Sequence, residues 1–208
     1  MKHIFLFFLI CTLCLCINAQ PLPVNVKILY DAAKTDIEKG KVLVRYFDEN
    51  IDNDTILKHF ITLKNHFEEK KEFVLFDYTM LGICRHLSRQ SEYTEAIKEL
   101  LQLLPRFVHR NDEYGVMICN RNLSYAYYAS GDKDKTLYYD QRTVDLSIPL
   151  AAKLDLAYAY NNFGADLAEY GHFDSAAKYS YAAVRISKEI NDSILISKTL
   201  GTLGEYFI

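Results

Sequence analysis

Apolar residues recur at helical spacing through most of the chain, in blocks that short polar turns separate. The clearest block is 160–176, YNNFGADLAEYGHFDSA, in which Phe163 and Leu167 are four residues apart and so share one face of a helix. Gly171 marks a tight turn, and a second helical pattern follows it. Ala176 in this second pattern is small enough for the two helices to pack closely. The stretch therefore predicts a helix, a turn and a second helix.

The same arrangement recurs at a constant interval in earlier and later parts of the chain. Small residues return at two positions where paired helices approach closely: Cys84, Ser124, Gly164 and Gly204, and Ala96, Thr136 and Ala176. Large apolar residues return at two others: Ile83, Leu123, Phe163 and Leu203, and Leu87, Tyr127, Leu167 and Phe207. A degenerate copy precedes them at Gly40, Leu43, Val44, Phe47 and Ile56. Internal repetition at a fixed period is typical of stacked helical repeats, whose terminal copies are atypical.

These spaced large and small residues, with the Leu203-Gly204 pair and its partial copies, resemble the tetratricopeptide repeat (TPR) family. The resemblance implies an all-α fold in which helix-turn-helix repeats stack into a right-handed α-solenoid. A period of about 40 residues exceeds the family's usual period of about 34. We place the surplus in an extra turn that opens each first helix, a long-period variant that resembles exported bacterial members.

The pattern divides the chain into a signal peptide at 1–19, a linker at 20–32 and a TPR-like solenoid at 33–208. The solenoid comprises a degenerate repeat at 33–72, repeats at 73–112, 113–152 and 153–192, and a partial repeat at 193–208. The expected helix pairs are 33–50/54–68, 73–90/93–105, 113–130/133–147 and 153–170/173–190, with a last helix from about 193. Pro21 and Pro23 favour the linker, and Pro105 and Pro149 are expected at or beyond helix ends, because proline disrupts a helix interior.

The N-terminus has the features of a secretory signal peptide. Lys2 precedes an uncharged, almost wholly apolar run at 4–17, and Ala19 offers a small residue before a cut at Gln20. The run is shorter than the roughly 20 residues of a membrane span. Cys11, Cys14 and Cys16 lie within it and follow large residues, which does not favour lipid anchoring. We therefore expect an exported protein, periplasmic or extracellular.

Composition narrows the possible partners. Lys and Arg number 24 and Asp and Glu 27, so the net charge of −3 implies neither nucleic acid nor an anionic membrane surface as a partner of this region. Half of the residues are hydrophobic, which is enough for a sizeable core. A membrane partner is expected only if the chain continues into a transmembrane helix.

Candidate chemistry is sparse, so the sequence predicts no enzyme and no cofactor. None of the six histidines forms a zinc-binding spacing with another histidine or a cysteine. Asp48, Asn50 and Asp52 begin like a calcium loop, but Asn53 and His59 replace its glycine and its final glutamate, so no metal is expected. Cys84 and Cys119 are either buried thiols or, after export, a disulfide. Three Asn-x-Ser/Thr sites are glycosylation acceptors if the host is eukaryotic: Asn53, Asn122 and Asn191.

In the TPR family the first helix of each repeat lines a concave groove, and ligands usually contact four positions of that helix. The resemblance places these positions at Tyr78, Leu81, Arg85 and Ser88; Ile118, Arg121, Tyr125 and Tyr128; and Tyr158, Asn161, Ala165 and Ala168. The candidate protein-binding residues among them are Tyr78, Arg85, Arg121, Tyr125, Tyr128, Tyr158 and Asn161. Tyrosine and arginine anchor many interfaces, whereas the Lys and Asn of the chaperone-binding carboxylate clamp are replaced by Leu81 and Arg85. A chaperone tail is therefore not expected.

The favoured hypothesis is an exported interaction module that binds a peptide or protein in this groove. The alternative is the extracytoplasmic sensory region of a truncated bacterial signal-transduction regulator, either a histidine kinase or a DNA-binding regulator. The chain stops at Ile208, after a repeat-opening helix that lacks its partner, and this favours the alternative. An apolar run of about 20 residues downstream of Ile208, followed by a signalling domain, would decide between the two.

Overall fold

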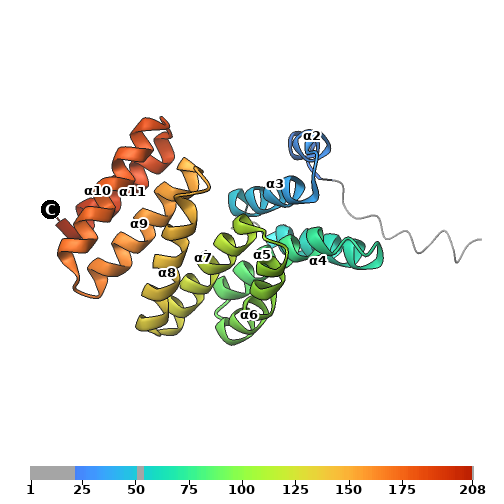
Figure 1. The fold of residues 1–208 in the computed structure, drawn as a ribbon, viewed down its shortest axis with the longest axis horizontal. Helices are drawn as coiled ribbons and strands as arrows, with labels where there is room; N and C mark the ends of the chain where they lie inside the picture. Colours follow the sequence, from blue (N-terminus) through green and yellow to red (C-terminus); the bar gives the residue numbers. More distant parts are fainter. Residues whose placement is uncertain (1–21, 51–53, 208) are drawn as a thin grey trace, which may run out of the picture. The chain divides into compact units, whose positions relative to one another are not determined.

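The computed structural model describes residues 22–50 and 54–207, and these contain ten α-helices and no strand (Figure 1). The predicted signal peptide lies outside the described residues. The helices are α2 (Val24–Ala32), α3 (Asp36–Glu49), α4 (Asp54–Glu69), α5 (Phe73–Arg89), α6 (Tyr93–His109), α7 (Glu113–Ser130), α8 (Lys133–Ser147), α9 (Lys153–Glu169), α10 (Phe173–Glu189) and α11 (Ser193–Phe207). The predicted all-α class is confirmed, and from α5 onward each helix begins at the residue where the hydrophobic pattern placed it.

The turns between helices share one backbone device. A residue with positive φ stands at evenly spaced positions, namely Lys71, Ser91, Asn111, Gly131, Ala151, Gly171 and Asn191. At most of these turns the next N–H bonds back to a carbonyl five residues earlier, as in Asp132 N to Tyr127 O and His172 N to Leu167 O. This is the Schellman motif, which satisfies the last carbonyls of a helix. Each of these turns therefore ends one helix, and the chain reverses its direction at a regular interval.

The described residues form two compact units that divide between Ile83 and Cys84, and the first contains a helix that the sequence did not predict. Residues 20–32 were predicted to be a linker, and this is corrected: Val24–Ala32 form α2, directly after Pro23 at its N-cap. Val26 is buried, and Tyr30 packs on the core cluster of Leu43, Leu63, Phe67 and Leu75. Proline is well tolerated at a helix start, so Pro23 favours α2 instead of preventing it.

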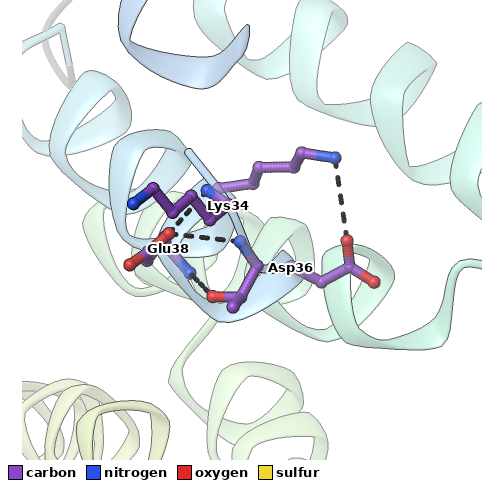
Figure 2. A network of polar contacts seen from close by, with 5 residues as sticks. Lys34, Asp36 and Glu38 are labelled. Carbon is purple, nitrogen blue, oxygen red and sulfur yellow. Dashed lines mark hydrogen bonds and ion pairs between the residues drawn. The ribbon is translucent and has the colours of Figure 1, made fainter. Parts of the chain in front are cut away.

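A capping box opens α3 (Figure 2). The Glu38 backbone N–H donates to Thr35 Oγ1 at 3.1 Å, and Glu38 Oε2 accepts from the backbone N–H groups of Lys34 at 2.6 Å and Thr35 at 3.1 Å. Lys39 Nζ lies 3.8 Å from Asp36 Oδ1 at the same helix end. These bonds satisfy backbone donors that the first helical turn leaves free, so α3 starts at Asp36, one turn later than the apolar pattern indicated.

A second core cluster of the first unit is built around aromatic rings. Phe47 of α3 and Phe60 of α4 meet edge to face, with ring centroids 4.9 Å apart, and Ile56 packs with them. Gly82 of α5 faces both rings, and a Cβ added there would lie 2.8 Å from Phe60. The glycine therefore lets α5 approach this aromatic pair closely.

In the second unit, α7 packs on α8 and α9 on α10, and α9, α10 and α11 lie side by side at the orange-to-red end of Figure 1. One core cluster joins Val144 of α8, Phe163 and Leu167 of α9, and Ala176 of α10. The two helices come close together at Gly164, where an added Cβ would lie 2.6 Å from Ser180 Oγ and 3.1 Å from Ser180 N. The predicted close approach of the two helices at Gly164 and Ala176 is confirmed, because the added Cβ would also lie 3.3 Å from Ala176 O.

Pro105 corrects another expectation, because it lies inside α6 and not at its end. Proline cannot donate to the carbonyl four residues earlier, which here belongs to Leu101. Both Pro105 and Leu101 are exposed, so water can bond the freed carbonyl. The helix therefore continues to His109 with a strong amphipathic pattern, burying Leu100, Leu103 and Phe107.

Cys84 and Cys119 are both free thiols with no exposed surface. Cys119 Sγ donates to Leu100 O at 3.3 Å, and burial raises the pKa of Cys84 to about 12. The sequence allowed either two buried thiols or a disulfide, and the structure agrees with the buried thiols.

We predict opposite effects of alanine at two glycines that occupy equivalent repeat positions. Gly164→Ala should lower the free energy of unfolding by about 1–3 kcal/mol, because the new methyl overlaps Ser180. Gly204→Ala is the control: nothing lies within 4 Å of its added Cβ, so alanine's better helix propensity should raise stability by about 0.5–1 kcal/mol. Urea unfolding measures both, and equal effects would contradict the packing.

A second prediction concerns the turns. Ala151 has φ 50° and Gly171 has φ 84°, and the left-handed region costs a non-glycine residue about 1–2 kcal/mol. Ala151→Gly should raise the melting temperature and Gly171→Ala should lower it, with about 0.5–1 kcal/mol gained or lost after chain-entropy changes are included. Calorimetry measures both shifts, and a loss on Ala151→Gly would show that this turn does not limit stability.

Candidate functional site

Side-chain contacts join the successive first helices of the second unit. The Arg85 guanidinium at the end of α5 lies over the Tyr125 ring of α7, 4.7 Å from its centroid. Tyr128 OH of α7 donates to Glu169 Oε2 of α9 at 2.8 Å. Further along, Lys198 Nζ of α11 lies 5.1 Å from the centroid of Tyr158 of α9. We call the residues Arg85, Arg121, Tyr125, Tyr128, Tyr158, Asn161 and Lys198 the first-helix face.

Arg85, Arg121 and Tyr125 form the cationic part of this face. All three side chains are half-buried, so their stems are packed while part of each remains in contact with solvent. Arg121 and Tyr125 are four residues apart on α7 and therefore neighbours on one side of the helix. A guanidinium group stacked over a tyrosine ring can still donate hydrogen bonds in its own plane. This arrangement suits recognition of a carboxylate or of peptide carbonyl groups.

Asn161 of α9 is almost wholly buried, with 3 % of its surface exposed. Its side-chain oxygen has no hydrogen-bond partner within the described residues. An unsatisfied buried acceptor costs about 1–3 kcal/mol, and a donor supplied from outside the chain would recover that energy. The position therefore has the properties of a ligand-contacting residue that is incomplete without a donor.

Tyr78 is corrected as a candidate site residue. It belongs to the first unit, its side chain is fully buried, and its ring fills the space against Gly40. Three more of the positions that usually contact ligands in the TPR family are also buried here, namely Leu81, Ser88 and Ile118. Ser88 Oγ donates to Cys84 O at 3.1 Å. These positions pack the core here, so the face available to a ligand starts at Arg85.

Sequence reasoning missed two acidic side chains, Asp140 of α8 and Asp166 of α9. Burial raises the pKa of both, to about 9 for Asp166, where the charge of Asp140 adds to the effect. Ser124 Oγ of α7 donates to Asp140 Oδ1. A signal was available in the repeat frame, because Asp140 stands where the other repeats have Leu100 and Ser180. A carboxyl group at a position that packs against other helices departs from the repeat pattern, and this departure was the signal in the sequence.

Other chemistry is limited in the part of the chain that the structure describes. No group of three or more His, Cys, Asp or Glu side chains there is placed to hold a metal ion. The calcium-like sequence from Asp48 lies partly outside the described residues. A shallow basic hollow of about 310 Å³ is lined by Pro105, Arg106, His109 and Arg110 at the end of α6. It is open to solvent, and none of its lining residues belongs to the first-helix face.

Within 22–50 and 54–207, no helix combines the length and apolar character needed to cross a bilayer.

The helices and their turns define the class of the fold as all-α, of the TPR-like helical-repeat type. Consistent with this, the chain is similar in structure to a Rap protein that was solved in complex with competence and sporulation factor. The TM-score is 0.69 at 13 % sequence identity, over 81 % of this chain and 48 % of that one. The chain therefore spans about half the length of this structural relative, and at this identity the likeness concerns the fold alone. No family model matches the sequence, and no curated protein matches it.

Proposed function

We propose that the chain is an exported, TPR-like interaction module that binds a peptide or protein segment on its first-helix face, without enzymatic activity. The observation that carries the proposal is the cationic, aromatic composition of this face, with a buried acceptor at Asn161. The fold supports it, because stacked helix pairs are a common scaffold for extended binding surfaces. The solved Rap protein complex gives an independent precedent of a bound factor on a similar fold.

The ligand chemistry follows from the side chains. Arg85, Arg121 and Lys198 supply positive charge, and the guanidinium groups match a carboxylate through two parallel hydrogen bonds. Tyr125 and Tyr158 offer rigid, amphipathic contact area at a low cost in side-chain entropy. Asn161 Oδ1 accepts one hydrogen bond, which the backbone N–H of an extended peptide provides. A peptide with a carboxylate near the segment that contacts α7 fits this set of groups best.

The binding test begins with a partner captured by pull-down from the exported fraction of the native host. Arg121→Ala and Tyr125→Ala should each weaken binding of that partner by at least about 1 kcal/mol, measured by calorimetry. The melting temperature should change little, because both side chains are half-buried on the surface of α7.

Matched controls lie on the second helices. Arg142 of α8 and Tyr181 of α10 are exposed, and their alanine variants remove the same two side-chain types from the other helix of the repeat. These variants should leave the affinity unchanged. If the controls abolish binding while Arg121→Ala and Tyr125→Ala bind normally, the ligand contacts the second helices and the proposed face is wrong.

Export is a separate part of the proposal, and its basis is the Lys2, apolar run and Ala19 arrangement at the N-terminus. N-terminal sequencing of the protein purified from its native host should begin at Gln20, after removal of the signal peptide. Protein that retains Met1 and co-fractionates with cytoplasmic markers would contradict export, and would leave the binding proposal to be tested on the intracellular fraction.

A further inference from the structure

Glu169 is the last residue of α9, and a tyrosine of the first-helix face holds its carboxylate. Tyr128 OH of α7 donates to Glu169 Oε2 at 2.8 Å, and both side chains are exposed. A hydrogen bond from a phenol orients a carboxylate and leaves its negative charge in place. The first-helix face therefore has a fixed negative charge at its border with the end of α9.

The position of Glu169 is electrostatically unfavourable. The free carbonyl groups at the C-terminal end of a helix already carry partial negative charge, which repels a carboxylate. The glutamates that end α3 and α10 have cations nearby: Arg45 Nε donates to Glu49 Oε1 at 3.0 Å, and Lys153 Nζ lies 3.2 Å from Glu189 Oε2. Among the described residues, no lysine or arginine forms an ion pair with Glu169. A cation from outside the described residues would relieve this repulsion.

The groups next to Glu169 do not change this conclusion. Burial, followed by the charges of Asp140 and Glu169, raises the pKa of Asp166 to about 9, so the Asp166 carboxyl is protonated at neutral pH. Lys133 Nζ of α8 donates to Tyr170 O at 3.2 Å and lies 4.9 Å from the Tyr170 ring centroid. The negative charge at this border of the face is therefore that of Glu169.

The cationic part of the face lies about two helical turns away along α7. Arg121, Tyr125 and Tyr128 are spaced by four and then three residues, so they form one line on the surface of the helix. Seven residues of α-helix rise about 10 Å. Arg85 lies over the Tyr125 ring, 4.7 Å from its centroid, and adds a second cation to this end of the line. The line therefore runs from positive charge at Arg121 to negative charge at Glu169.

This separation of charge sets a requirement for the ligand. An extended peptide rises about 3.3 Å per residue, so about three residues cover the distance of about 10 Å. A complementary peptide has an acidic side chain or its C-terminal carboxylate at Arg121, and a lysine or arginine about three residues away at Glu169. The reversed arrangement places like charges together, which disfavours binding.

We infer that Glu169 determines the specificity of the first-helix face, which selects peptides that have a basic side chain about three residues from a carboxylate. Tyr128 is the positioning residue that directs the Glu169 carboxylate toward this basic side chain. The inference rests on the proposed peptide-binding function, and it adds the charge pattern of the ligand and the direction in which the ligand lies across α7.

Affinity selection from a random octapeptide library on the full chain, with sequencing of the bound peptides by mass spectrometry, tests the charge pattern. At about three positions from an acidic residue or from the C-terminus, the wild type should prefer Lys or Arg over Asp or Glu by roughly two- to fivefold, the size of one exposed ion pair. Glu169→Lys should invert this preference. Glu169→Gln should abolish the preference without inverting it, and it provides the test if the lysine variant folds poorly.

Two further variants separate specificity from general effects of charge and folding. Tyr128→Phe keeps the ring and removes the hydroxyl, so it should reduce the preference for Lys or Arg while uncharged peptides bind as they do to the wild type. Asp145→Lys changes the net charge as Glu169→Lys does, but Asp145 is exposed on α8, where its carboxylate accepts from Gln141 Nε2 at 2.8 Å. This control should keep the wild-type preference.

The outcomes distinguish this inference from the proposed function. If the wild type selects no peptide, the proposed binding function is wrong and the inference is wrong with it. If the wild type selects peptides, but Glu169→Lys leaves their charge pattern unchanged or Asp145→Lys inverts it equally, Glu169 does not determine specificity and the binding function stands.

Discussion

Close helix-to-helix approach at small side chains is the contact on which the rest of this structure depends. At Gly164 the backbone of α9 comes so near to Ser180 of α10 that a single methyl group would overlap. Such an approach requires that the turn between the two helices set the direction in which the chain returns. Gly171, which has a positive φ, ends α9, so that α10 can pack against it. Because similar turns recur at even spacing from Lys71 to Asn191, successive helix pairs within a unit can present equivalent faces to one another.

The helices could be predicted from sequence because their signals are local and repeated. Phe163 and Leu167 define the apolar face of one helix, and Ala176 lies on the facing side of the next. Copies of these residues at a constant interval reinforce a pattern that would be weak in a single copy. The predictions of helix positions were wrong where the rule that proline disrupts a helix has an exception. Pro23 precedes a helix that it helps to start, and Pro105 lies on an exposed helix face where solvent replaces the lost hydrogen bond.

The candidate site was predictable in part, for a related reason. The repeat frame and the resemblance to the TPR family placed Arg85 and Tyr125 on neighbouring first helices, where the structure has them in contact. Position alone does not determine burial, and Tyr78 is enclosed because Gly40, distant in sequence, leaves room for its ring. The partnerless oxygen of Asn161 likewise depends on what its surroundings lack among the described residues, which no one-dimensional pattern records.

The buried carboxyl of Asp140 shows how one repeat can differ from its neighbours at an equivalent position. In repeat proteins each unit contacts mainly its neighbours, so overall stability is close to a sum of repeat and interface terms. Burial raises the pKa of the Asp140 carboxyl on α8, so one of those terms depends on pH. Leu100, at the equivalent position of the preceding repeat, shows that an apolar side chain fits there. Ser124 Oγ donates to Asp140 Oδ1, whereas a leucine side chain has no group that could accept such a bond, so the carboxyl replaces apolar packing by a hydrogen bond between α7 and α8.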